Sequence, residues 1–134
     1  QIKRICIILS YVLLLFVLIH NLRIKGIWII AVGTMLNFIA MLANGGFMPV
    51  SPEARFVAGK TPVIIFPDAT LLTGSGGIVL PQEQTRLWIL TDILPVSSIR
   101  TVFSIGDIII GVGILAVFTF LMIHIMQRRR GPAG

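Results

Sequence analysis

The sequence is poor in charge, and in acidic residues above all. Of its 134 residues 12% are charged, and five Asp or Glu stand against eleven Lys or Arg, which gives a net charge of +6. A soluble domain carries about twice that share of charged residues, whereas the mean hydropathy here is +0.99. These values exclude an ordinary water-facing domain and favour a membrane protein.

The sequence also has little of what catalysis needs. Cys6 is the single cysteine, so an internal disulfide is excluded and cysteine pairing says nothing about the compartment. Neither a Ser/His/Asp set on one side of the membrane nor a metal-ligand spacing is found. We therefore predict that the chain is not an enzyme.

What the sequence has instead is three apolar runs, at residues 5–22, 27–43 and 105–126. Each is close to the ~20 residues that cross a bilayer core. The first run is not followed by a small-residue cleavage site, so we interpret it as a retained helix. The prediction is an all-α integral membrane protein, a single membrane domain over residues 1–134, with three transmembrane helices and a long, partly helical loop.

Positive charge lies on one side of these runs. Arg23 and Lys25 separate the first two runs, residues 128–130 are all Arg, and no acid accompanies either group. Because Lys and Arg in short loops stay in the cytoplasm, residues 21–26 and the basic tail 127–134 are expected inside a cell membrane and residues 45–104 outside. Cations at the ends of apolar runs are typical of membrane anchors, so we predict no nucleic-acid partner.

The connection 21–26 is short, which predicts an antiparallel hairpin of the first two helices. Small residues on the second and third helices offer surfaces for close helix contact: Ala31, Gly33, Ala40, Gly106, Gly111 and Gly113. Asn37 lies in the middle of the second run. A lone amide in hydrocarbon is costly, so we expect Asn37 to form a hydrogen bond to another helix.

The outer segment, residues 45–104, is too long for a connecting loop without structure or function of its own. The order Ser51-Pro52-Glu53 predicts the N-cap, first-turn proline and early acid of a short helix that stops at Gly59. Residues 81–94 interleave apolar and polar side chains, which predicts an amphipathic interfacial helix with Trp88 at headgroup depth. Residues 63–66 form an apolar patch between two prolines.

Four segments carry a resemblance to a known family: NGGFMPVSPEA (44–54), TRL (85–87), DILP (92–95) and VFSIGD (102–107). Together they resemble a family of small bacterial integral membrane proteins of unknown function, and the likeness spans about residues 10–126. The resemblance implies further apolar sequence upstream of Gln1 and no established activity. It also implies that a shared role lies in the outer motifs and Asp107. The sequence departs from the family pattern at Thr91 and at residues 96–97.

Asp107 is the most informative single candidate, because an acid in the first turn of a span has several uses. It can cap the helix N-terminus, pair with Arg100 or Arg86, or bind a cation or proton. The other structural or interface candidates lie in the outer motifs: Asn44, Gly45, Gly46, Pro49, Ser51, Glu53, Arg86, Trp88 and Asp92.

His20 and His124 are both placed near the inner ends of their spans. Two imidazoles from two helices can ligate a haem iron, and one can ligate a chlorophyll magnesium. Histidines at a membrane interface commonly have no ligand, and neither residue lies in a cofactor motif. We predict no resident cofactor and no metal, with haem or chlorophyll contact by His20 and His124 as the alternative.

The predicted function is that of a non-catalytic accessory or scaffolding subunit of a larger bacterial membrane complex, for example an energy-transducing or photosynthetic one. Apolar outer patches at residues 47–48, residues 63–66 and Trp88 suit contact with other membrane subunits or with the lipid bilayer. The alternative is a component of an ion or small-solute transporter. Three spans without an inverted repeat make a poor solute pathway for one chain.

Overall fold

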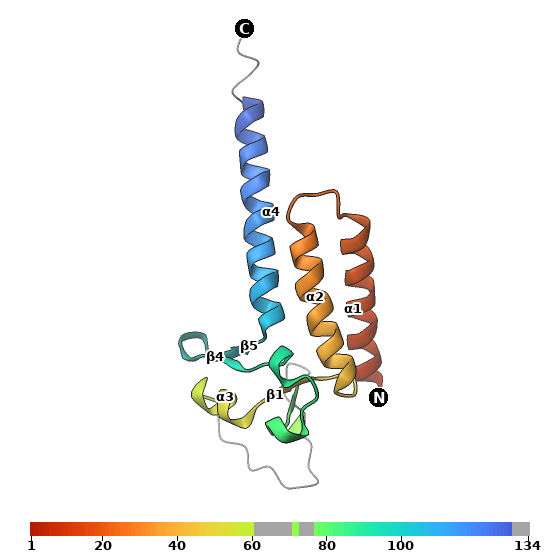
Figure 1. The fold of residues 1–134 in the computed structure, drawn as a ribbon, viewed down its shortest axis with the longest axis vertical. Helices are drawn as coiled ribbons and strands as arrows, with labels where there is room; N and C mark the ends of the chain where they lie inside the picture. Colours follow the sequence, from red (N-terminus) through yellow and green to blue (C-terminus); the bar gives the residue numbers. More distant parts are fainter. Residues whose placement is uncertain (61–70, 73–76, 130–134) are drawn as a thin grey trace.

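The fold consists of three long helices that stand on a small cap (Figure 1). It is a computed structural model that describes residues 1–60, 71–72 and 77–129. The long helices are α1 (Ile2–His20), α2 (Ile27–Ala43) and α4 (Ile105–Arg129). The cap, which is the described part of residues 44–104, lies where α1 begins, α2 ends and α4 begins, and the connection 21–26 lies at the distal end (Figure 1).

Two of these helices have the length and composition to cross a membrane. In α1 and α4, 11% and 6% of the most apolar 18-residue window is buried inside the fold. The shorter α2 has 17 residues, which at ~1.5 Å per residue is about 26 Å, against about 30 Å for the hydrocarbon core. The predicted runs 5–22 and 105–126 thus correspond to helices of membrane-crossing length, and α2 is an apolar helix below that length.

The predicted hairpin of the first two helices is confirmed, and α2 packs more extensively on α4 than on α1. A Cβ added at Gly33 would lie 2.6 Å from the Gly106 carbonyl oxygen, and one at Gly113 would lie 2.6 Å from Cγ1 of Ile30. A Cβ at Gly111, in contrast, would meet nothing within 4 Å. Three of the predicted small residues therefore allow α2 and α4 to approach closely, while Gly111 lies on another face of α4.

The described part of the cap contains five short strands, so the prediction of an all-α chain is wrong there. One sheet has the order β1-β3-β2, with β1 parallel and β2 antiparallel to β3, and β4 and β5 form a separate antiparallel pair. Backbone pairing satisfies the polar groups of these short extended pieces, which is needed wherever backbone is buried. The strands are β1 (Met48–Val50), β2 (Leu71–Leu72), β3 (Gly77–Val79), β4 (Leu94–Val96) and β5 (Thr101–Phe103).

The helix predicted after Ser51 is confirmed as α3 (Pro52–Val57), with the Ser51 Oγ accepting from the Ala54 N–H at 3.0 Å. Gly59 follows with a φ of +74°, a left-handed conformation that ends helices. α3 packs on the strands through a small apolar core that contains Val50, Ala54, Ala58, Val79 and Val102.

The prediction of an amphipathic helix over residues 81–94 is wrong. That segment contains two single 3₁₀ turns, η1 (Gln82–Gln84) and η2 (Trp88–Leu90). Thr85 is extended and Leu87 has a φ of 52°, so a continuous α-helix is interrupted twice. A third turn, η3 (Ser97–Ile99), connects β4 to β5. The apolar patch predicted at residues 63–66 lies outside the described residues.

Candidate functional site

A hydrogen-bonded cluster joins α2 to the first turn of α4. Asn37 Nδ2 donates to Asp107 Oδ1 at 2.7 Å, and Ser104 Oγ donates to Asn37 Oδ1 at 2.8 Å. The Ser104 N–H donates to Asp107 Oδ2 at 2.9 Å, and the Asp107 N–H donates to Ser104 Oγ at 3.1 Å. The last two bonds form a capping box, in which the N-cap and the third helical residue satisfy each other's backbone donors.

A second cluster fastens the cap to the end of α2. The Asn44 side chain donates to the Ala40 and Arg86 carbonyl oxygens at 2.8 Å each, and its Oδ1 accepts from the Arg86 N–H at 2.9 Å. Gly45 and Gly46 follow with φ values of +74° and +88°. Arg4 of α1 lies where a Cβ added at Gly46 would stand, and it donates to the Gly45 carbonyl at 3.4 Å. This places a cation at the negative end of the α2 dipole.

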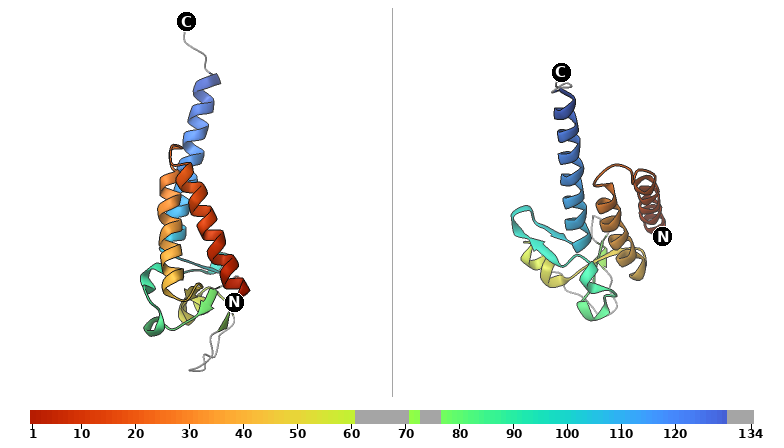
Figure 2. Two further views of the ribbon diagram at one scale, coloured as in Figure 1. Left: turned by 90° about the vertical axis from the view of Figure 1, so that its right-hand side faces the viewer. Right: turned by 45° about the horizontal axis from the view of Figure 1, so that its top comes forward.

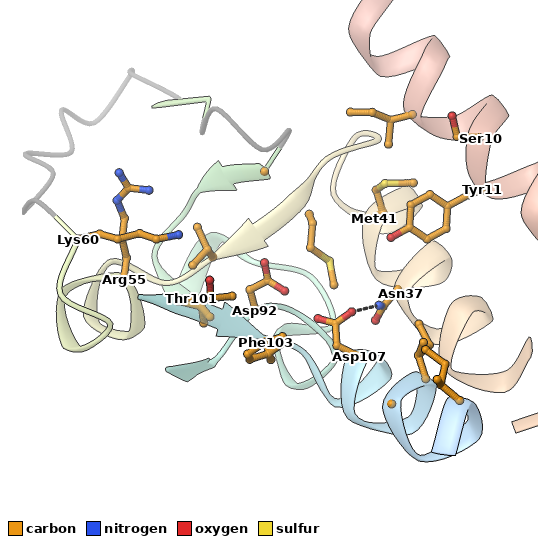
Figure 3. Close-up of a pocket in the computed structure, with 18 residues that line it drawn as sticks. Ser10, Tyr11, Asn37, Met41, Arg55, Lys60, Asp92, Thr101, Phe103 and Asp107 are labelled. Carbon is orange, nitrogen blue, oxygen red and sulfur yellow. Dashed lines mark hydrogen bonds between the residues drawn. The ribbon is translucent and has the colours of Figure 1, made fainter. Parts of the chain in front are cut away.

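A cavity of about 720 Å³ lies between the cap and the three long helices. The long helices contribute apolar and polar side chains: Ile7, Ser10 and Tyr11 from α1, Asn37 and Met41 from α2, and Asp107, Ile110, Gly111 and Ile114 from α4. The cap contributes Arg55, Lys60 and Asp92 together with residues of β1 and β5. Figure 3 shows Asp92 between the Asp107 side of the cavity and the side that carries Arg55 and Lys60.

The polar groups of this cavity are incompletely paired. Burial raises the pKa of the Asp92 carboxyl to about 7, with the Asp107 charge adding to the increase and Lys60 opposing it. The carboxylate of Asp92 accepts no hydrogen bond within residues 1–60, 71–72 and 77–129. The Nε of Arg55 is buried and has no hydrogen-bond partner in the same part of the chain.

The remaining candidates of the outer motifs are spread over the cap. The Pro49 carbonyl accepts from the Asp92 N–H at 3.0 Å, which holds Asp92 beside β1. Ser51 and Glu53 belong to the first turn of α3. Trp88 is 41% exposed and lies in η2. Ser51, Glu53 and Trp88 line a smaller groove of about 420 Å³ on another side of the cap.

The two histidines belong to the distal end, and the groove that His124 lines does not include His20 among its described residues. His20 ends α1 and packs on Phe16, with ring centroids 5.0 Å apart. His124 lines a groove between α4 and the connection 21–26, together with Arg23 and Lys25. Ligation of a haem or chlorophyll by His20 and His124 stays a prediction.

Sequence reasoning missed several residues of the cavity and of the cluster beside it. The Ser104 capping box was recognisable, because Ser followed three residues later by an acid marks a helix start. Arg55, Lys60 and Tyr11 carry no such signal. They line one cavity with Asp92 because α1, α3 and the segment before β4 all border it. Figure 2 shows in two further views that the cap lies at the N-terminal end of α4.

Comparison with known proteins gives a relative and a family. No solved structure matches the chain. A Thermotoga maritima protein described as uncharacterized is 30% identical over 122 residues, which cover 87% of this chain and 64% of the relative. The chain therefore spans less than two thirds of the length of that relative. The model of a family of unknown function, DUF5317, matches residues 1–119, so the chain belongs to the DUF5317 family.

Proposed function

We propose that this chain is a non-catalytic accessory subunit of a larger bacterial membrane complex. In this proposal α1, α2 and α4 cross the membrane, the connection 21–26 and the basic tail lie in the cytoplasm, and the cap lies outside. The closely packed α2–α4 pair acts as a rigid support, since glycine contacts and the Asn37 cluster fix α4 to α2. The cap then presents a surface to a partner subunit.

The observation that carries this proposal is an exposed apolar surface on the cap, which we call the cap face. Phe56 and Val57 of α3 are 63% and 55% exposed, and Val96 and Ile99 of the β4–β5 hairpin are 38% and 60% exposed. The Ser97 hydroxyl donates to the Val57 carbonyl at 2.7 Å, which holds the two elements together. Clustered apolar side chains outside the long helices are typical of protein interaction surfaces.

The groove beside the cap face supports the same proposal. It shares Val57 with the cap face and is walled mainly by apolar and small side chains, among them Trp88, Ile93 and Pro95. A Trp at the edge of such a groove supplies a large contact area and an N–H donor. Both features suit a bulky apolar side chain of a neighbouring subunit.

The test is gentle purification of the tagged protein from its native membrane, with identification of the chains recovered in fixed stoichiometry. Phe56→Ser and Ile99→Ser should each reduce recovery of the partner several-fold, because they place polar groups in the buried interface. Phe56→Leu is the matched control and should retain the partner. Recovery of the wild-type chain alone, as a homo-oligomer, would contradict the proposal.

The second candidate, a component of an ion or small-solute transporter, is supported by Asp92. A carboxyl whose pKa is about 7 can take up and release a proton near neutral pH. This candidate predicts ion or solute flux in liposomes that contain the protein, and loss of that flux in Asp92→Asn. The accessory subunit gives no flux.

A further inference from the structure

The cavity between the cap and the long helices has charges of both signs at one end and apolar side chains at the other. We propose that it binds a phospholipid whose head group carries an ammonium and a phosphate, as in phosphatidylethanolamine. This inference rests on the membrane placement proposed above. It does not depend on which face of the membrane the cap occupies.

The phosphate would be bound by Arg55 and Lys60. Both side chains line the cavity, on one side of Asp92 (Figure 3). The buried Nε of Arg55 has no acceptor within the described segments of the chain, and Lys60 forms no ion pair there although it faces Asp92 closely enough to lower its pKa. A phosphate offers several charged acceptor oxygens and pairs strongly with a guanidinium.

The ammonium would be bound by Asp92. Asp107 already accepts hydrogen bonds on both carboxylate oxygens, from Asn37 and from the Ser104 N–H. Asp92 accepts none from the described residues, and its charge is disfavoured by burial and by the nearby Asp107. A cation between two carboxylates offsets this repulsion. Asp92 therefore receives the N–H donors, and Asp107 adds negative charge behind it.

The acyl chains would leave the cavity between α1 and α4. The apolar end is lined by Ile7 of α1, Met41 of α2, and Ile110 and Ile114 of α4. Ile114 lies nine residues after the start of α4, which at ~1.5 Å per residue is roughly 13 Å from the cap. Ile114 is 54% exposed, so this end opens toward the surface of α4 that would face lipid. A single cavity lined by both charged and apolar side chains fits an amphipathic ligand.

The experiment is native mass spectrometry of the protein released from phosphatidylcholine nanodiscs that contain equal amounts of phosphatidylethanolamine and phosphatidylglycerol. The wild type should retain phosphatidylethanolamine over phosphatidylglycerol by about tenfold, as one additional charge-assisted contact predicts. Asp92→Asn should abolish this preference. Glu83→Gln, which removes an equal charge from an exposed site outside the cavity, should leave it unchanged. Lys60→Gln should reduce retention of both lipids.

Equal retention of the two lipids by the wild type, or an unchanged preference in Asp92→Asn, would overturn the proposal. Displacement of the bound lipid by soluble phosphoethanolamine would overturn the lipid as the source of the head group. Thermal unfolding of each variant identifies loss of fold as a separate cause, and Asp92→Glu, which keeps the charge, should keep the preference. Failure of this proposal leaves recovery of the partner by the cap face unaffected, so the two can be judged separately.

Discussion

At the scale of single residues, Asn37 holds the start of α4 against α2. It is 2% exposed and bonds to Asp107 and Ser104 at once. The position of an amide in an apolar run predicted an interhelical hydrogen bond, and the sequence alone could not say that its partners would be Asp107 and Ser104. That pairing depends on how α4 is set beside α2.

Asn37→Leu should destabilise the fold by about 2–3 kcal/mol, because Asp107 Oδ1 loses its donor and the buried Ser104 hydroxyl loses its acceptor. Unfolding by heat or denaturant in detergent measures the change. Asn21→Leu is the control, since the exposed Asn21 side chain donates to the Val17 carbonyl of its own helix. It should shift the free energy of unfolding by less than about 0.5 kcal/mol. Equal stability of Asn37→Leu and wild type would contradict the role given to the cluster.

Asp92 makes stability depend on pH. Its pKa is raised from 3.8 to about 7 in the fold, so folding favours the protonated form. The resulting stabilisation is complete below about pH 4 and is lost as the pH rises to 7. Asp92→Asn should remove this dependence and be more stable than wild type above pH 7. Unfolding midpoints between pH 4 and 8 measure this pH dependence, with Glu83→Gln as the control. If the midpoints of Asp92→Asn and wild type change with pH in parallel, Asp92 is not the group responsible.

At the scale of elements, the α2–α4 contact depends on glycines that meet backbone. Gly113→Ala should destabilise the fold by about 1–3 kcal/mol, because the added methyl would lie 2.8 Å from the Ile30 backbone nitrogen. Gly111→Ala, two residues away on an open face, should be neutral or slightly stabilising, since alanine favours helix. Thermal unfolding of the two variants is the measurement. An equal loss of stability in both would contradict a close α2–α4 contact at Gly113.

The elements differ in how far the sequence predicts them. Long apolar runs and the Ser51-Pro52 start are local signals, and the helices they predict are present. Residues 81–94 have helical spacing of apolar side chains, yet they form 3₁₀ turns, because Arg86 is held by the Asn44 side chain and Asp92 by the Pro49 carbonyl. Pairing of β1 with β3 joins segments that are distant in the chain, so no local sequence pattern predicts it.

The candidate site likewise combines residues that local sequence signals predict with residues that only the tertiary structure brings in. Asn37 and Asp107 were predicted from their positions as polar residues, and Asp92 from the outer motif to which it belongs. All three line one cavity. Arg55 and Lys60 were not among the predicted site residues. They reach the cavity because α3 folds back against β4 and β5, which is a tertiary contact.

At the scale of the whole molecule, we propose that the cap and the connection 21–26 lie on opposite sides of a membrane. Figure 1 places these two regions at opposite ends of α2. The most direct test is labelling of intact cells with a membrane-impermeant maleimide, in a Cys6→Ser background. Glu83→Cys in the cap should be labelled in intact cells, and Asn21→Cys should be labelled only after the membrane is permeabilised. Labelling of both positions in intact cells, or of Asn21→Cys alone, would contradict the account.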